Sequence, residues 1–177
     1  MMAREVGDRR MQLRTAKLSD ATAVTTLLER AYPTLMAASY DAAVLVLALP
    51  SMTKSNPILL ASETYYVVED NGRLVGCGGW TPGKPGTGEA EPGVAHLRHF
   101  ASDPDQARQG IGRLIYNQCA TDANDHGATR FQVFAALNAE SFYERLGLRR
   151  VRVINLAMGP GITFPTILME GPVAVAS

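Results

Sequence analysis

The sequence has few cysteines, no excess of charge and no long apolar run. The two cysteines, Cys77 and Cys119, lie far apart without CxxC spacing, which excludes a disulfide scaffold, gives no metal site and favours a reducing cytoplasm. The 17 basic residues balance the 17 acidic ones, so no broad field attracts nucleic acid or an anionic membrane. The longest apolar run, Ala42 to Leu49, is much shorter than the roughly 20 residues that cross a bilayer. We therefore expect a cytoplasmic protein with neither nucleic-acid nor membrane partners.

The composition that remains is typical of a globular protein. The chain has 177 residues, of which 46% are hydrophobic and 19% charged, a size and balance that favour one core and exclude disorder as the main state. We expect a single domain over residues 11–172, preceded by a polar tail over residues 1–10 and followed by a short tail over residues 173–177. Met11 is an alternative start.

In the first half of the chain, the patterns predict a strand, two helices and a hairpin. A cap signal and helical spacing indicate a first helix that ends near Pro33. The second helix, 42–49, is apolar on every side, so we expect it to be buried or to cover an apolar site. Asn71-Gly72 supplies the positive φ that a tight hairpin turn requires. The expected elements are a strand from residue 11, helices 19–33 and 42–49, and strands 64–68 and 73–77.

In the second half, a segment rich in proline and glycine, residues 81–93, predicts a loop that separates the third strand from the fourth. The elements expected after it are strand 94–102, helix 110–126, strand 130–135, helix 139–146 and a final hairpin of strands 151–158 and 162–169. This order predicts an α/β (α+β) domain around a mixed, mostly antiparallel sheet with one parallel crossover.

The turn from Arg108 to Arg113 joins a strand to a helix, so free backbone N–H groups and the positive end of the helix dipole meet there. Gly110 and Gly112 remove Cβ atoms that would keep an anion from the backbone, and the two arginines add charge. The pattern predicts a phosphate site, although a plain glycine turn with surface arginines is the alternative. It lacks the third glycine of a dinucleotide-binding turn and the Lys-Ser/Thr of a P-loop.

Three runs around this turn resemble the GNAT superfamily of acyl-CoA-dependent N-acyltransferases. They are Phe100-Ala-Ser-Asp-Pro104, Arg108-Gln-Gly-Ile-Gly-Arg-Leu-Ile115 and Asn138-Ala-Glu-Ser-Phe-Tyr-Glu-Arg-Leu-Gly147. The resemblance extends from residue 11 to about residue 172, because the order of elements is also that of the family. It implies a GNAT-like fold with a sheet of six to seven strands, splayed between the fourth and fifth, and about four flanking helices.

The resemblance implies an N-acetyltransferase that transfers an acetyl group from acetyl-CoA to a primary amine in a ternary complex, without a metal. The cofactor would lie in the splay, with its thioester carbonyl directed at a backbone N–H near Phe100. Ala107 departs from the family's pattern, which weakens one side-chain contact. The residues implied in cofactor binding are Phe100, Ala101, Ser102, Arg108, Gln109, Gly110, Ile111, Gly112, Arg113 and Asn138. From this site we expect Gly112→Val to abolish CoA binding with the fold largely intact.

Two residues are candidates for the chemistry. Tyr143 matches the family's Phe-Tyr-Glu-x-x-Gly motif, whose tyrosine commonly protonates the leaving thiolate, although it could instead pack the short helix against the sheet. His96 lies on the fourth strand, where several members place a base; a structural histidine or a water chain is the alternative. By strand alternation His99 should point to the opposite face unless a bulge intervenes. Glu89 and Glu91 are reserves.

The acceptor is less specified by the sequence. Tyr32, Met36 and Tyr40 lie where the family usually binds its acceptor, which suggests a partly apolar amine, with core packing as the alternative. The acceptor could be a small-molecule amine or a peptide or protein amine, and the family also allows a homodimer. Rival functions are a non-catalytic acyl-CoA-binding sensor and a transferase of a longer acyl group.

Overall fold

The computed structural model describes residues 3–6 and 9–177, which form a mixed sheet with helices on both faces. The eight strands that it describes follow the order β1-β2-β3-β4-β5-β6-β8-β7, and only β5 and β6 pair in parallel. The strands are β1 Ala3–Val6, β2 Arg9–Thr15, β3 Tyr65–Asp70, β4 Arg73–Thr81, β5 Val94–Ser102, β6 Arg130–Ala136, β7 Arg149–Gly159 and β8 Ile162–Pro172. The predicted fold class is confirmed, and β1 is an addition to the expected strands.

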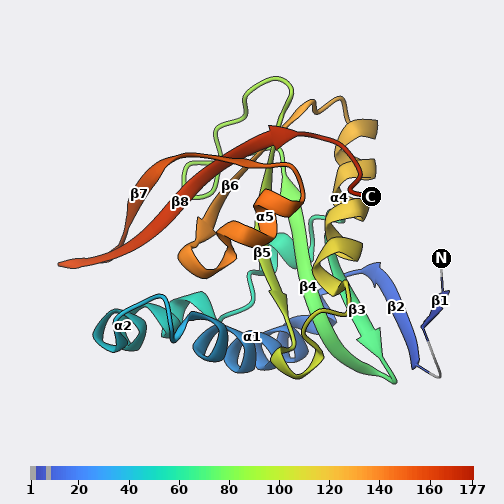
Figure 1. The fold of residues 1–177 in the computed structure, drawn as a ribbon, viewed down its shortest axis with the longest axis horizontal. Helices are drawn as coiled ribbons and strands as arrows, with labels where there is room; N and C mark the ends of the chain where they lie inside the picture. The colour runs from blue at the N-terminus through green and yellow to red at the C-terminus, as the bar shows by residue number, and fades with distance from the viewer. Residues whose placement is uncertain (1–2, 7–8) are drawn as a thin grey trace.

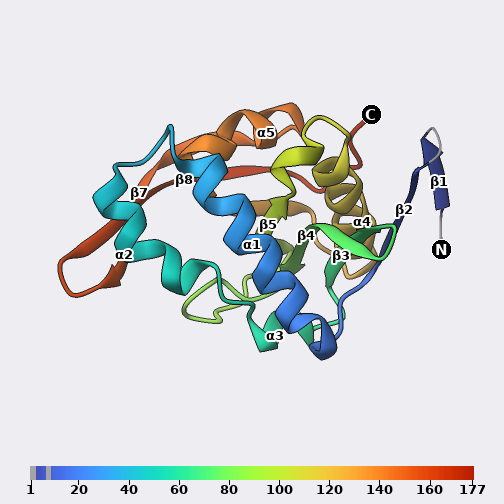
Figure 2. The ribbon, with the colours of Figure 1, turned by 90° about the horizontal axis from the view of Figure 1, so that it is seen from below.

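Five α-helices and three short 3₁₀ helices connect the described strands. The α-helices are α1 Ala21–Met36, α2 Ala42–Met52, α3 Pro57–Leu60, α4 Ile111–Asp125 and α5 Glu140–Arg145, and the 3₁₀ helices are η1 Leu18–Asp20, η2 Pro104–Gln106 and η3 Leu137–Ala139. Figure 1 shows the helices distributed around the sheet, and the view from below in Figure 2 shows α1 crossing one of its faces with α2 beside it.

The sheet separates two hydrophobic cores. One core lies between the sheet and α1 to α3, and the other lies between the opposite face and α4 and α5. Strand β3 contributes to both because its side chains alternate: Tyr65 and Val67 belong to the first core, Tyr66 and Val68 to the second. Burial on both faces explains why this strand is almost continuously apolar.

The sheet opens between β5 and β6. These strands are paired only from Val94 to His96, opposite Arg130 to Gln132. Beyond this point β5 remains paired with β4, whereas β6 is paired with β8 along its whole length. The opening lies between the fourth and fifth of the strands expected from residue 11, as predicted, and it leaves a space bordered by the ends of both strands.

The first two helices are longer than the sequence predicted. Helix α1 continues through Pro33 to Met36, and α2 continues through Pro50 to Met52. Each proline removes one backbone donor near a helix end, and burial of Met36, which is 3% exposed, stabilises the last turn of α1. Of the two alternatives expected for α2, burial or cover over an apolar site, full burial is excluded, because Val46 and Leu47 are exposed. Helix α3 was not predicted.

The chain ends are more ordered than the expected tails. Within the described residues, β1 pairs with β2, although residues 1–2 and 7–8 of the expected tail lie outside the description. After β8, the hydroxyl of Tyr116 donates to the carbonyl of Ala174, and Asn117 exchanges two hydrogen bonds with Ala176. The end of the chain is therefore attached to α4. Among the described helices, none has both the length and the hydrophobicity needed to span a membrane.

Candidate active site

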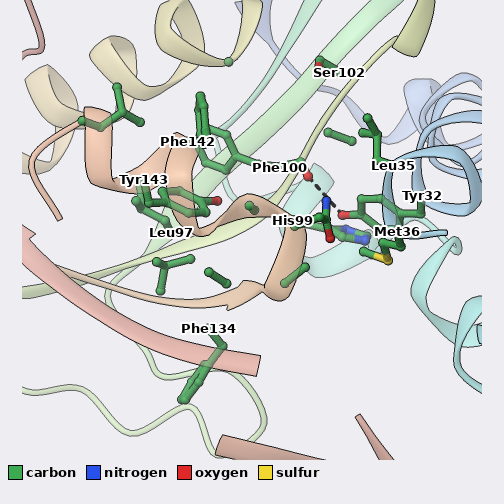
Figure 3. Close-up of a pocket in the computed structure, with 18 of the residues that line it drawn as sticks. Tyr32, Leu35, Met36, Leu97, His99, Phe100, Ser102, Phe134, Phe142 and Tyr143 are labelled. Carbon is green, nitrogen blue, oxygen red and sulfur yellow. Dashed lines mark hydrogen bonds between the residues drawn. The ribbon is translucent and has the colours of Figure 1, made fainter. Parts of the chain in front are cut away.

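A cavity of about 840 Å³ follows the opening in the sheet. It extends from the N-terminus of α4, between β5 and β6, to α1 and the β7–β8 hairpin, and α5 forms part of its wall. Figure 3 shows Phe142 and Tyr143 on one side of this cavity and Tyr32, Met36 and His99 on the other, with Phe100 between them. A single cavity therefore joins segments that lie far apart in the sequence.

The turn from Arg108 to Arg113 forms one end of the cavity, and all six of its residues line it. Both Arg108 and Gly110 have left-handed backbone conformations, with φ of 64° and 75°. A Cβ atom at Gly110 would meet nothing within 4 Å, so this residue faces open space at the start of a 15-residue helix. Free N–H groups, the helix dipole and two arginines coincide here, as an anion site requires.

Gly112 has a different role from the one we expected. A Cβ atom at this position would lie 2.8 Å from the ring of Phe142, so the glycine permits α4 to approach α5. Gly112→Val would displace Phe142, the neighbour of Tyr143 in the sequence. The expected loss of CoA binding in Gly112→Val stays a prediction, and the substitution would in addition disturb the packing beside the candidate acid.

A buried ion cluster fixes the start of the turn. Asp103 is 1% exposed and accepts hydrogen bonds from Arg30 on α1, with an Nη1–Oδ2 distance of 3.1 Å. Arg73 of β4 lies 3.2 Å from the same carboxylate oxygen. The other carboxylate oxygen of Asp103 accepts a hydrogen bond from the backbone N–H of Asp105 at 3.0 Å. The segment that leads into the turn is thereby attached to both α1 and β4.

Strand β5 contains a bulge where it borders the cavity. His99 and Phe100 have no partner in β4, because Arg98 lies opposite Gly79 and Ala101 opposite Cys77. His99 takes a φ of 55°, an uncommon value for a residue with a side chain. Bulges re-aim side chains next to functional sites, and both bulged residues line the cavity.

Neighbouring side chains hold this bulge in place. The Tyr65 hydroxyl donates to the His99 carbonyl at 2.9 Å, and the Cys77 thiol donates to the same oxygen at 3.7 Å. The Tyr32 hydroxyl donates to the Phe100 carbonyl at 3.2 Å, as Figure 3 shows. The glycine at position 78 leaves room for the Phe100 ring, since a Cβ atom there would lie 2.8 Å from it.

The imidazole of His99 is positioned as a proton acceptor. Its Nε2 lies 2.9 Å from the carbonyl oxygen of Met52. Because a carbonyl only accepts, Nε2 carries the proton in this contact, which leaves the lone pair on Nδ1. Burial is the main cause that lowers the pKa of His99, and Arg98 lowers it further. The ring is therefore neutral at pH 7.

The structure separates the other base candidates from the cavity. His96 is 4% exposed and is not among the residues that line the cavity. Burial lowers its pKa, with smaller contributions from Arg98 and Lys84. Glu89 and Glu91 also lie outside the lining. The residue that the sequence assigned to the opposite face, His99, is the histidine that borders the cavity.

Tyr143 and Asn138 both lie at the cavity, where the sequence placed them. Tyr143 is 4% exposed, and burial raises its pKa well above the usual value, so the hydroxyl keeps its proton at pH 7. Its ring packs against Phe142 and Phe100, with centroids at 5.0 and 6.1 Å. The amide oxygen of Asn138 is buried without a hydrogen-bond partner among the described residues, which marks a position for a ligand donor.

The far end of the cavity combines predicted and unpredicted residues. Tyr32 and Met36 line this end as expected. Tyr40 does not line the cavity, but its ring stacks on that of the lining residue Phe164, with centroids 4.3 Å apart. The Tyr40 hydroxyl donates to the Pro165 carbonyl at 2.7 Å and accepts from the Leu137 N–H at 2.8 Å. No pattern in the sequence indicated the remaining lining residues of this end, which are Leu35, Met52, Leu156, Met158, Phe164 and Thr166.

Comparison with known proteins agrees with this arrangement. The model of the acetyltransferase (GNAT) family matches residues 23–148. The chain belongs to the GNAT family of acetyltransferases. The match includes β5, the turn from Arg108 to Arg113, β6 and α5, so family membership covers most of the cavity's lining. No curated protein matches the chain at a significant level.

Solved structures of low sequence identity share the fold. The PaiA N-acetyltransferase from Thermoplasma acidophilum, solved in complex with coenzyme A, is 13% identical with a TM-score of 0.68, over 92% of this chain and 98% of that one. A GCN5-related N-acetyltransferase from Rhodopseudomonas palustris is 16% identical with a TM-score of 0.73, over 97% and 98%. The ribosomal-protein-S18-alanine N-acetyltransferase from Escherichia coli is 17% identical with a TM-score of 0.62, over 94% and 96%.

Proposed function

We propose that this GNAT protein is an N-acetyltransferase that transfers an acetyl group from acetyl-CoA to a primary amine by direct attack in a ternary complex. One observation carries the proposal: a continuous cavity joins the N-terminus of α4 to Tyr143 and His99 through the opening between β5 and β6. The coenzyme A in the PaiA complex supports the choice of donor.

The residues present fit acetyl-CoA. The backbone N–H groups of the turn and the guanidinium groups of Arg108 and Arg113 suit its pyrophosphate. The unpartnered oxygen of Asn138 suits an amide N–H of its pantetheine arm. Phe100 has no partner in β4, and its N–H is the proposed donor to the thioester carbonyl oxygen. Acetyl-CoA supplies an acetyl group that is activated as a thioester.

His99 and Tyr143 have complementary roles in this proposal. His99 accepts the proton of the attacking amine on Nδ1, and Tyr143 holds a proton on its hydroxyl for the departing sulfur. His99 also lines a second hollow of about 440 Å³, beside Lys54 and Ser55, which offers the proton a route to solvent. His96 has no such access and is replaced by His99 as the proposed base.

Donor binding is tested by thermal unfolding with acetyl-CoA, with CoA and with ATP as a control nucleotide. Because a ligand that binds only the native state stabilises it by about 2.7 kcal/mol at 100 times its Kd, we expect acetyl-CoA and CoA to raise the midpoint and ATP to leave it unchanged. Release of free thiol in the presence of amines then tests transfer. A midpoint insensitive to millimolar acetyl-CoA would contradict the proposal, and binding without thiol release would indicate a sensor.

The role of His99 is tested by the pH dependence of kcat/KM with one fixed amine. A lowered pKa means that His99 is a competent base above that pKa and loses this ability as the pH falls through it, below 6.5. Protonation of the amine alone gives log kcat/KM a slope of about one against pH. Below the pKa of His99 we expect the slope to rise to about two, because the base is then protonated as well. The His99→Gln variant should lack this additional slope. If its pH profile of kcat/KM equals that of the original protein, His99 is not the base.

A further inference from the structure

We infer that the acceptor is a primary monoamine with an apolar body and no second charged group. This inference rests on the proposed function and concerns the acceptor end of the same cavity. That end is formed by α1, the last residue of α2 and the β7–β8 hairpin. We call its apolar part the acceptor wall, which consists of Leu35, Met36, Met52, Leu156, Met158 and Phe164.

The charged side chains of the cavity lie elsewhere. Arg108 and Arg113 flank the anion-binding turn, and Arg145 ends α5. No charged residue reaches the cavity from α1, α2, β7 or β8, and the described residues that line the cavity include neither aspartate nor glutamate. His99, which faces the same end, is neutral at pH 7 because burial lowers its pKa. The cavity thus has a cationic donor end and an uncharged acceptor end.

The few polar side chains at the acceptor end already use their hydrogens within the protein. The Tyr32 hydroxyl donates to the carbonyl of Phe100, and the Thr166 hydroxyl donates to the carbonyl of Ile154 at 2.9 Å. The Nε2–H of His99 is directed at Met52. What remains for a bound molecule at this end is uncharged acceptors, the Nδ1 lone pair of His99 and the hydroxyl oxygens of Tyr32 and Thr166. They can accept from one amine, but they offer no donor to a carboxylate and no negative charge to a second ammonium.

These features favour an apolar acceptor on energetic grounds. A carboxylate or a second ammonium bound at this end would lose its hydration without gaining a charged partner. An apolar body would instead gain from contact with the acceptor wall. Desolvation in the same surroundings lowers the pKa of the bound amine, which increases the fraction in the neutral, nucleophilic form.

Two matched pairs of amines test this inference in assays of thiol release. Phenylalanine differs from 2-phenylethylamine by a carboxylate, and 1,8-diaminooctane differs from octylamine by a second ammonium. We expect kcat/KM to be at least tenfold higher for the singly charged member of each pair. Equal values, or a preference for the doubly charged member of either pair, would overturn the inference.

A change of specificity tests the location of the acceptor wall. Leu156 is half-buried on β7, and Leu156→Glu places a carboxylate at the acceptor end; we expect the ratio of kcat/KM for 1,8-diaminooctane over octylamine to rise at least tenfold. Val153→Glu is the control, because Val153 lies on the same strand, is 51% exposed and does not line the cavity. Met158→Glu, also at a half-buried position of β7, repeats the test if Leu156→Glu does not fold. An unchanged ratio in the folded variants would overturn the assignment.

The two proposals fail in different ways. If acetyl-CoA binds and the zwitterionic or dicationic amines are acetylated better, the protein is an N-acetyltransferase and the inferred acceptor class is wrong. If acetyl-CoA does not stabilise the protein, the proposed function fails and the inference fails with it. If acetyl-CoA stabilises the protein but neither octylamine nor 2-phenylethylamine releases thiol, the inference is overturned, and the proposed function is tested with a wider panel of amines.

Discussion

Replacing Tyr143 by phenylalanine is expected to lower kcat of the proposed reaction by about 10²-fold or more, the usual contribution of a positioned proton donor. The hydroxyl is the only atom removed, and it makes no hydrogen bond with another described residue, so its loss leaves packing unchanged. The ring continues to contact Phe100 and Phe142. The affinity for acetyl-CoA should therefore remain within about twofold of the original value, as measured by calorimetric titration.

Tyr116→Phe is the matched control for this substitution. Tyr116 is also fully buried, but its hydroxyl donates to the carbonyl of Ala174 at 3.0 Å, and it does not line the cavity. Its removal should lower the free energy of unfolding by about 1 kcal/mol and leave kcat unchanged. Equal turnover in Tyr143→Phe and the original protein would exclude Tyr143 as the acid and support the alternative that it only packs α5 against the sheet.

Gly110→Ala is expected to weaken the binding of CoA by about tenfold or more. The residue lies at φ 75°, where a side chain costs about 1–2 kcal/mol, and its new methyl group would enter the open space at the start of α4. One lost charge-assisted hydrogen bond is worth about 1.5–3 kcal/mol, which corresponds to a tenfold change or more in Kd. Calorimetric titration with CoA measures the effect.

Gly127→Ala separates this binding effect from backbone strain. Gly127 follows α4 at its other end, has a φ of 86° and likewise faces open space. Both variants should lose similar stability, but only Gly110→Ala should bind CoA more weakly. If the two variants bind CoA equally well, the turn from Arg108 to Arg113 does not hold the pyrophosphate.

Local patterns were sufficient to predict most of the strands and the glycine turn before α4. The hairpin at Asn71-Gly72 follows from a turn that needs positive φ, and the turn before α4 follows from glycine spacing next to a helix start. The splay between the fourth and fifth expected strands was implied only by the resemblance to the GNAT family. Helix ends were less predictable, because Pro33 and Pro50 lie in helices that tertiary packing extends.

The proposed base and the proposed acceptor end depend on contacts that no local pattern contains. The bulge at His99 is stabilised by Tyr65 and Cys77 from two other strands, and the residue itself has a side chain that disfavours positive φ. The sequence therefore pointed to His96, three positions earlier. The acceptor wall joins α1 to the β7–β8 hairpin across most of the chain length, which only the folded sheet brings together.

Tyr40 limits how the acceptor end can adapt to its ligand. Its hydroxyl connects β8 to the turn after β6, and its ring supports Phe164 from behind. To enlarge this end, the segment between α1 and α2 would have to move away and break both hydrogen bonds, at a cost of about 1 kcal/mol each. If this end holds the proposed acceptor, these contacts of Tyr40 would limit the length of the amine, and selection by size would follow from packing rather than from a closing movement.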